Sequence, residues 1–172
     1  MRAKSRYNAL MPTPEPRPIT PGEQRARRRR AARIARKLGF VRRIEYRHVY
    51  SQTGGAQYGR GSSAQADLLT VYAEAFERDA DPNDFSVEAM IAHECGHQIL
   101  ARHPRIAKRV AGVSEASEEI LASLFGAMIC NEDSDRIALY AKAVAELLDH
   151  GQRVEAATRQ LQELCELLEA LL

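Results

Sequence analysis

The arrangement of apolar and polar residues divides the chain into a tail, a mixed central region and a helical remainder. Residues 1–21 hold five prolines between positions 12 and 21, which forbids a helix there and favours an extended, solvated tail. Residues 22–38 are strongly helix-forming, and Gly39 after them is a typical helix stop. Only a narrow stripe of this helix is apolar, formed by Ala31, Ile34, Ala35 and Leu38. We therefore predict a Pro-rich basic tail over residues 1–21, followed by a helix with one buried edge.

Residues 41–76 have the composition of β-strands. β-Branched and aromatic side chains recur at near-alternate positions at the start of this region, namely Val41, Ile44, Tyr46, His48 and Tyr50. The Thr53-Gly54-Gly55 sequence predicts a turn, and Gln57-Tyr58-Gly59 indicates the start of a returning strand. Residues 68–76 indicate another strand, although their alanine and glutamate residues leave that interpretation ambiguous. We therefore expect these strands to form a small antiparallel or mixed β-sheet.

The remainder of the chain is predicted to be helical. After a polar loop over residues 79–84, helices are expected over four ranges: 85–102, 114–130, 134–149 and 152–171. The last of these has one amphipathic face, formed by Val154, Ala157, Leu161, Leu164, Leu168 and Leu171. A helix, a small strand region and then further helices predict an α+β fold, with residues 22–172 as one domain.

Length and composition are those of a soluble, single-domain protein. The chain has 172 residues, of which 45% are hydrophobic and 28% charged. No apolar run approaches the length of a membrane span, so no membrane partner is expected. The three cysteines, Cys95, Cys130 and Cys165, are far apart, which argues against a disulfide framework and for a reducing compartment. We therefore expect a cytoplasmic protein.

The net charge of +2 hides a strong asymmetry along the chain. Residues 1–43 contain fourteen Lys or Arg and only two acids, whereas residues 144–172 contain six Asp or Glu and two Arg. A basic block of this kind binds nucleic acid or an acidic surface, or it is a solvated arm that packs on the chain's own acidic end. A weak nucleic-acid contact through residues 25–37 therefore stays open. The block lacks aromatic residues for stacking, which argues against sequence-specific reading of single strands.

Residues 93–97, His-Glu-Cys-Gly-His, carry the strongest chemical signal. Positions i and i+4 share one face of a helix, so His93 and His97 present two imidazoles to one point, where a zinc ion fits. Glu94 stands about 100° around the helix axis, where it misses the metal but reaches a water bound to it. Zinc lowers the pKa of bound water towards 7, and Glu94 then takes the proton as general base. The motif predicts a zinc-dependent hydrolase.

A catalytic zinc takes three protein ligands and leaves one position for water, so a third ligand is needed. His103 continues the histidine spacing of one zinc protease group. A continuous helix, however, places His103 about 80° from His93 and on the wrong side of it from His97. The glycine that would turn the chain back is absent, because Leu100 stands in its place. His103 is therefore a weak candidate for the third ligand.

The predicted helix over residues 114–130 offers two better candidates, Glu118 and Glu119. Glu119 shares its side of the helix with three small residues, Ala122, Ser123 and Gly126. Small residues let a second helix approach closely, which a ligand-bearing helix must do. Glu118 leans towards the apolar stripe of the same helix and is the second choice. Both glutamates would also stabilise the helix N-terminus through the macrodipole.

Two segments resemble the ImmA/IrrE-like metallopeptidases. Residues 92–100 (AHECGHQIL) resemble the zinc-binding stretch of that family. Residues 119–127 (EILASLFGA) are similar to its second segment, and also to the segment of other gluzincins whose first glutamate is the third zinc ligand. Ser123 stands where Asn or Asp is usual. The resemblance covers roughly residues 85–130, and it implies Glu94 as catalytic acid/base and three zinc ligands, His93, His97 and Glu119. We therefore expect residues 22–172 to form a single zincin-like metalloprotease domain.

The expected function is a zinc endopeptidase that hydrolyses a protein or peptide substrate. Zincins bind an extended substrate along an edge strand beside the signature helix, and residues 66–76 are the candidate for that strand. Four side chains are candidates for stabilising the oxyanion, namely Tyr140, His150, His103 and Arg136. Cys95 is expected to be a buried apolar residue rather than a reactive thiol. The alternative function is a nucleic-acid-associated regulator with a basic N-terminal arm and a sensory or vestigial zinc site.

Overall fold

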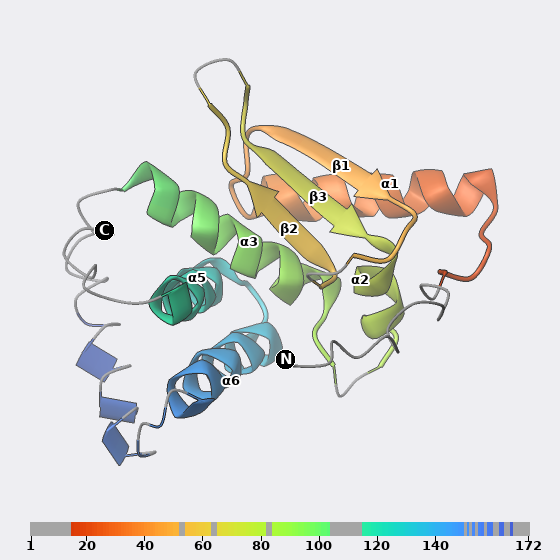
Figure 1. Ribbon diagram of the computed structural model, residues 1–172. Coiled ribbons are helices and arrows are strands. Elements are labelled where there is room, and N and C mark those ends of the chain that lie inside the picture. Colours follow the sequence, from red (N-terminus) through yellow and green to blue (C-terminus); the bar gives the residue numbers. More distant parts are fainter. Residues whose placement is uncertain are drawn as a thin grey trace, which may run out of the picture.

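The computed structural model has an α+β fold, with a three-stranded mixed sheet and a mainly helical C-terminal half (Figure 1). It describes residues 15–51, 54–62, 65–81, 84–103 and 115–149, together with residues 151, 153, 155, 156, 158, 159, 162, 163 and 166. The predicted fold class is confirmed. Most of the predicted tail, residues 1–14, lies outside this part of the chain.

Helix α1 spans Pro21–Lys37, in agreement with the predicted helix. The Thr20 side chain caps it by accepting a hydrogen bond from the Glu23 amide at 3.1 Å. The prediction that the prolines up to position 21 exclude a helix is wrong for Pro21, because proline is well suited to the first helical position. Gly39 follows the helix with φ +87°, a conformation that favours glycine.

The sheet contains β1 (Arg43–Arg47), β2 (Ala56–Gly59) and β3 (Leu68–Tyr72) in the order β1-β3-β2. β3 pairs parallel with β1 and antiparallel with β2, so it is the central strand. The expectation that residues 66–76 supply the edge strand beside the signature helix is therefore wrong. The strand ends at Tyr72, and the alanine- and glutamate-rich residues after it form the short helix α2 (Ala73–Arg78). The edge strand that packs on the signature helix is β2.

Three longer helices follow: α3 (Val87–Arg102), α5 (Glu115–Ile129) and α6 (Asp133–Asp149). They confirm the helices predicted over 85–102, 114–130 and 134–149. In Figure 1, α3 runs alongside the sheet, α5 packs on α3, and α6 packs on α5. The apolar positions expected on a fourth helix over 152–171 lie outside the described residues, although positions such as 155, 158 and 162 are helical.

The core consists of two apolar clusters that meet at α3 and α5. The first joins the buried stripe of α1 to the inner side of the sheet and to α3, and its fully buried members include Ala31, Leu69, Val71 and Ile91. The second lies between α3, α5 and α6, and includes Leu100, Leu124, Phe125 and Ala143. The helix that carries the histidines is therefore packed against both clusters.

Helices α3 and α5 approach each other through glycine and alanine. A Cβ atom added to Gly96 of α3 would overlap the backbone carbonyl of Ala122 in α5. A Cβ atom added to Gly126 of α5 would lie 2.8 Å from the carbonyl oxygen of Ala92 in α3. Neither carbonyl can move without shifting its helix. The contact therefore requires glycine at both positions, and it fixes how close the two helices lie.

We expect Gly96→Ala to destabilise the protein by about 1–3 kcal/mol, because the methyl group forces α3 and α5 apart. Gly126→Ala should have a smaller effect in the same direction. Gly22→Ala in α1 is the matched control, because a Cβ atom at position 22 would lie at an ordinary contact distance of 3.7 Å from Thr20 Oγ1. This variant should be as stable as the wild type. Urea unfolding of the three variants measures these differences. Equal stability of Gly96→Ala and Gly22→Ala would contradict the tight contact.

Candidate metal centre

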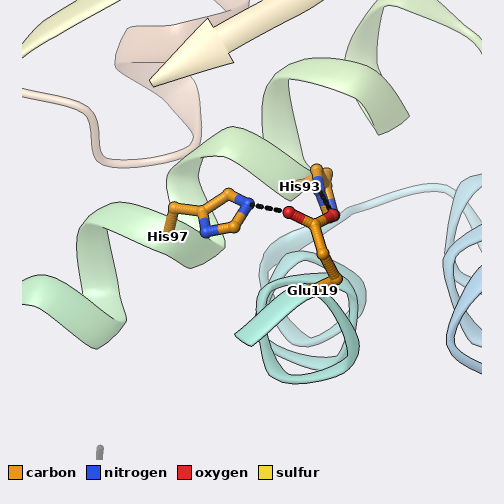
Figure 2. A group of neighbouring side chains, drawn as sticks. All are labelled: His93, His97 and Glu119. Carbon is orange, nitrogen blue, oxygen red and sulfur yellow. Dashed lines mark hydrogen bonds and ion pairs between the residues drawn. The ribbon is translucent and has the colours of Figure 1, made fainter. Parts of the chain in front are cut away.

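His93 and His97 lie one turn apart on α3, and both rings face the same carboxylate on α5 (Figure 2). The Nε2 atom of His93 lies 3.1 Å from Glu119 Oε2, and the Nε2 atom of His97 lies 3.3 Å from Glu119 Oε1. The two rings are 4.9 Å apart, edge to face. Two imidazole rings and one carboxylate group, from two helices, therefore converge on one point.

The separations of these donor atoms suit a tetrahedral metal ion. Ligand atoms held at 2.0–2.1 Å around a tetrahedral ion lie about 3.3 Å from one another. The two contacts of Glu119 agree with this value, and one ligand atom from each of the three residues lies within 4.8 Å of the others. His93, His97 and Glu119 can therefore hold a metal ion. They are the single such group found in the part of the chain that the structure describes.

The outer ring nitrogens of both histidines also have polar neighbours on α5. His93 Nδ1 lies 3.1 Å from Ser123 Oγ, and both side chains are buried. His97 Nδ1 lies 3.4 Å from Glu118 Oε1, whose side chain is 66% exposed. A partner on Nδ1 favours the tautomer that leaves the Nε2 lone pair free for a metal. Ser123 therefore supports the His93 ring from α5, and Glu118 lies on the outer side of His97.

Glu94 is largely buried beside this group, and it faces the edge strand. Its Oε2 atom accepts a hydrogen bond of 2.7 Å from the backbone amide of Tyr58 in β2. Burial raises the pKa of Glu94 to about 7, although the charge of His97 and the Tyr58 amide both oppose this shift. A carboxyl group with such a pKa can accept and release a proton near neutral pH.

The three converging residues have pKa values that reflect their contacts. The hydrogen-bond contacts with His93 and His97 hold the pKa of Glu119 far below its usual range, so the carboxylate is charged. Burial lowers the pKa of His93 and keeps its imidazole neutral, as a metal ligand must be. Burial also acts to lower the pKa of His97, but its contact with Glu119 and the nearby charges outweigh burial and raise it.

The structure brings His93, Glu94, His97 and Glu119 together, as the sequence predicts. His103 is the C-terminal cap of α3, and its amide still bonds to the carbonyls of Ile99 and Leu100. The chain therefore does not turn back at Leu100, and His103 is not a member of the group. This outcome agrees with the absence of a glycine at that position.

Lys142 of α6 also contacts the site, and sequence reasoning missed it. Its Nζ atom lies 3.2 Å from Glu119 Oε2 and 3.4 Å from Glu146 Oε1, and the side chain is 27% exposed. Nothing in the sequence distinguishes this lysine from a surface lysine of a helix. Only the packing of α6 on α5 places it beside Glu119.

The other predicted side chains have different surroundings. Arg136 bonds to the Cys130 carbonyl and to Asp133 at the start of α6, so it is engaged away from the histidines. His150 and Cys165 lie outside the described residues. Cys95 is buried, as predicted, and burial raises the pKa of its thiol to about 12, which disfavours the reactive thiolate form.

Comparison with protein-family models, with curated proteins and with solved structures finds no match to this chain. Among the described helices, none is long and apolar enough to cross a membrane.

In the metal-free protein, we expect Glu94→Gln to be more stable than the wild type at pH 8 and nearly equal at pH 5. Folding raises the pKa of Glu94 from 4.5 to about 7, so the folded state favours the protonated form. The associated stability is present below pH 4.5 and is lost as the pH rises through about 7. The free energy of unfolding of the variant, relative to the wild type, should therefore increase by about 2–3 kcal/mol between pH 5 and pH 8.

Urea unfolding in the presence of a chelator measures this difference. Glu163→Gln, at an exposed position near the C-terminus, is the matched control. Its stability relative to the wild type should not change with pH. A difference between Glu94→Gln and wild type that stays constant from pH 5 to pH 8 would show that Glu94 is not buried as described.

Proposed function

We propose that this protein is a zinc-dependent endopeptidase of the cytoplasm that hydrolyses a peptide bond in a protein or peptide substrate. The observation that carries the proposal is the convergence of two imidazole Nε2 atoms and one carboxylate, with a buried second carboxylate beside them. Two histidines and a glutamate are a donor set of catalytic zinc sites. The pKa of Glu94, about 7, suits a general base at neutral pH.

In this proposal, His93, His97 and Glu119 would hold the zinc ion. Zinc would lower the pKa of a bound water and polarise the substrate carbonyl. Glu94 takes the proton from the attacking water and returns it to the leaving amine. The contacts of Ser123 with His93 and of the Tyr58 amide with Glu94 hold the two side chains in place, so little reorganisation accompanies the reaction.

The edge strand β2 is the best-placed element to bind an extended substrate. One edge of β2 pairs with β3, and the backbone amide of Tyr58 on its other edge reaches Glu94. An extended peptide that pairs with this outer edge would therefore have its backbone next to the general base. This assignment replaces residues 66–76, whose strand is paired on both sides.

The purified protein should contain about one zinc ion per chain. Glu94→Gln should keep the metal and lose cleavage, because the variant removes the base and leaves the ligands. Removing a group that only contacts a metal ligand typically lowers metal affinity by about 10- to 100-fold. Glu119→Gln removes a ligand itself, so it should lower zinc affinity by more than this. Metal analysis and cleavage of a randomised, quenched-fluorescence peptide mixture measure both effects.

Glu118→Gln and His103→Ala are matched controls, since they remove a second glutamate of α5 and a further histidine next to α3. His103→Ala should keep zinc binding and most of the activity. Glu118→Gln alters only an outer contact of His97, so it should lose less zinc affinity than Glu119→Gln. Full cleavage by Glu94→Gln would exclude the proposed mechanism. Loss of zinc from Glu118→Gln but not from Glu119→Gln would show that the third ligand is assigned incorrectly.

We also propose that Lys142 stabilises the negative charge that develops on the substrate oxygen. Its ammonium group is partly buried and lies within 3.2 Å of a Glu119 oxygen, so it faces the reacting region. Lys142→Met should lower kcat by about 100- to 1000-fold with unchanged zinc content, as for other oxyanion donors. Lys37→Met, an exposed lysine of α1, is the control. Loss of zinc in proportion to activity would show that Lys142 acts only by holding Glu119.

A further inference from the structure

The outer face of α1 is strongly basic. Five arginines lie on it, and all are exposed: Arg25, Arg28, Arg29, Arg33 and Arg36. At 100° per residue they fall within an arc of about 140°, opposite the buried stripe that contains Ala31 and Ile34. We call these five residues the arginine face.

No carboxylate of the described residues forms an ion pair with the arginine face. The other cations of α1 do have partners, and these attach the helix to the rest of the protein. Arg27 pairs with Glu23 and packs over the Phe76 ring, Arg30 pairs with Asp79 at 2.7 Å, and Lys37 lies 4.0 Å from Glu88. Like charges three and four residues apart repel one another on a helix. The five arginines therefore oppose folding unless an anion binds them.

An anionic membrane and the acidic end of the chain are two possible partners that fit this face less well. A basic amphipathic helix binds a membrane by inserting its apolar side. The apolar side of α1 is already buried in the core, because Ala31 and Ala35 are 0% exposed. The acidic end of the chain begins in α6. The acids of this end that lie on α6 are Glu146 and Asp149. Figure 1 shows α1 behind the sheet, with α3 between it and α6.

We propose that the arginine face binds the phosphate backbone of double-stranded nucleic acid, independently of sequence. Guanidinium groups bind phosphate through two parallel hydrogen bonds, and all five cations are arginine. The distance from Arg25 to Arg36 along the helix axis is about 16 Å, and a duplex carries one charge per about 1.7 Å of its axis. Several phosphates are thus within reach. α1 contains no aromatic residue on which an unpaired base could stack, so a duplex fits better than a single strand.

This interaction does not depend on the proposed protease activity. The arginine face lies on α1 behind the sheet, whereas the histidines face α5. A duplex on α1 leaves the metal centre accessible, so the two sites can be occupied together. The two proposals can also fail separately.

The test uses the full-length Glu94→Gln protein and fluorescence anisotropy of a labelled 24-base-pair DNA duplex between 50 and 200 mM NaCl. If all five arginines contact phosphates, the slope of log affinity against log salt should be about −4 to −5. Replacing Arg25, Arg29 and Arg33 by alanine should reduce the magnitude of that slope by about 2.7 and weaken binding roughly tenfold or more at 100 mM NaCl. Alanine favours helix, so circular dichroism should show an intact fold.

The matched control removes the same charge elsewhere, with Arg60, Arg102 and Arg153 replaced by alanine, and it should retain most of the affinity. Duplex RNA serves as a second arm, and its affinity relative to DNA identifies which duplex is preferred. An unchanged slope in the α1 variant would overturn the proposal. Tighter binding to single strands, or to vesicles containing anionic lipid, would also overturn it and assign the face to that ligand.

Discussion

The close contact between α3 and α5 is the constraint on which the candidate metal centre depends. Gly96 and Gly126 remove the side chains that would hold the two helices apart, and backbone carbonyls occupy the space instead. At this separation a glutamate side chain from α5 is long enough to reach both histidines of α3. A wider contact would leave the imidazoles and the carboxylate too far apart to share one ion. The donor set is therefore a consequence of helix packing.

The same packing brings ionisable groups together in a partly buried site, and it shifts their pKa values in different directions. Glu119 keeps its charge because two histidines and Lys142 surround it. Glu94 has a backbone amide as a partner but is more deeply buried, and its pKa rises to about 7. Two carboxylates close in space thus acquire opposite properties, one a permanent anion and the other a group that exchanges protons. This difference matches the roles of ligand and base.

The sheet and α1 separate two chemically distinct surfaces. Edge strand β2 lies beside the candidate metal centre, and its Tyr58 amide donates a hydrogen bond to Glu94. Helix α1 lies behind the sheet and exposes five arginines. These five arginines form no ion pair with a carboxylate of the described residues, and they lie on the side of α1 opposite its buried stripe. Under our two proposals, one of these surfaces binds a nucleic-acid duplex and the other binds a peptide.

The sequence by itself determined the features that depend on neighbours along the chain. The spacing of His93 and His97 fixed two donors on one helix face, and the small residues after Glu119 indicated which glutamate would approach them. Helix periodicity predicted α1, α3, α5 and α6 within a few residues. These predictions succeed because each depends on the geometry of one helix and on the side chains that the helix carries.

Only the tertiary structure decided which separate elements lie together. The order β1-β3-β2 makes residues 68–72 the central strand and leaves β2 at the edge of the sheet. Local strand propensity cannot predict this order. The contacts of Lys142 with Glu119 and of Tyr58 with Glu94 likewise join positions 23 and 36 residues apart. Strand pairing and helix packing minimise the free energy of the whole core, so a single segment cannot specify its neighbour.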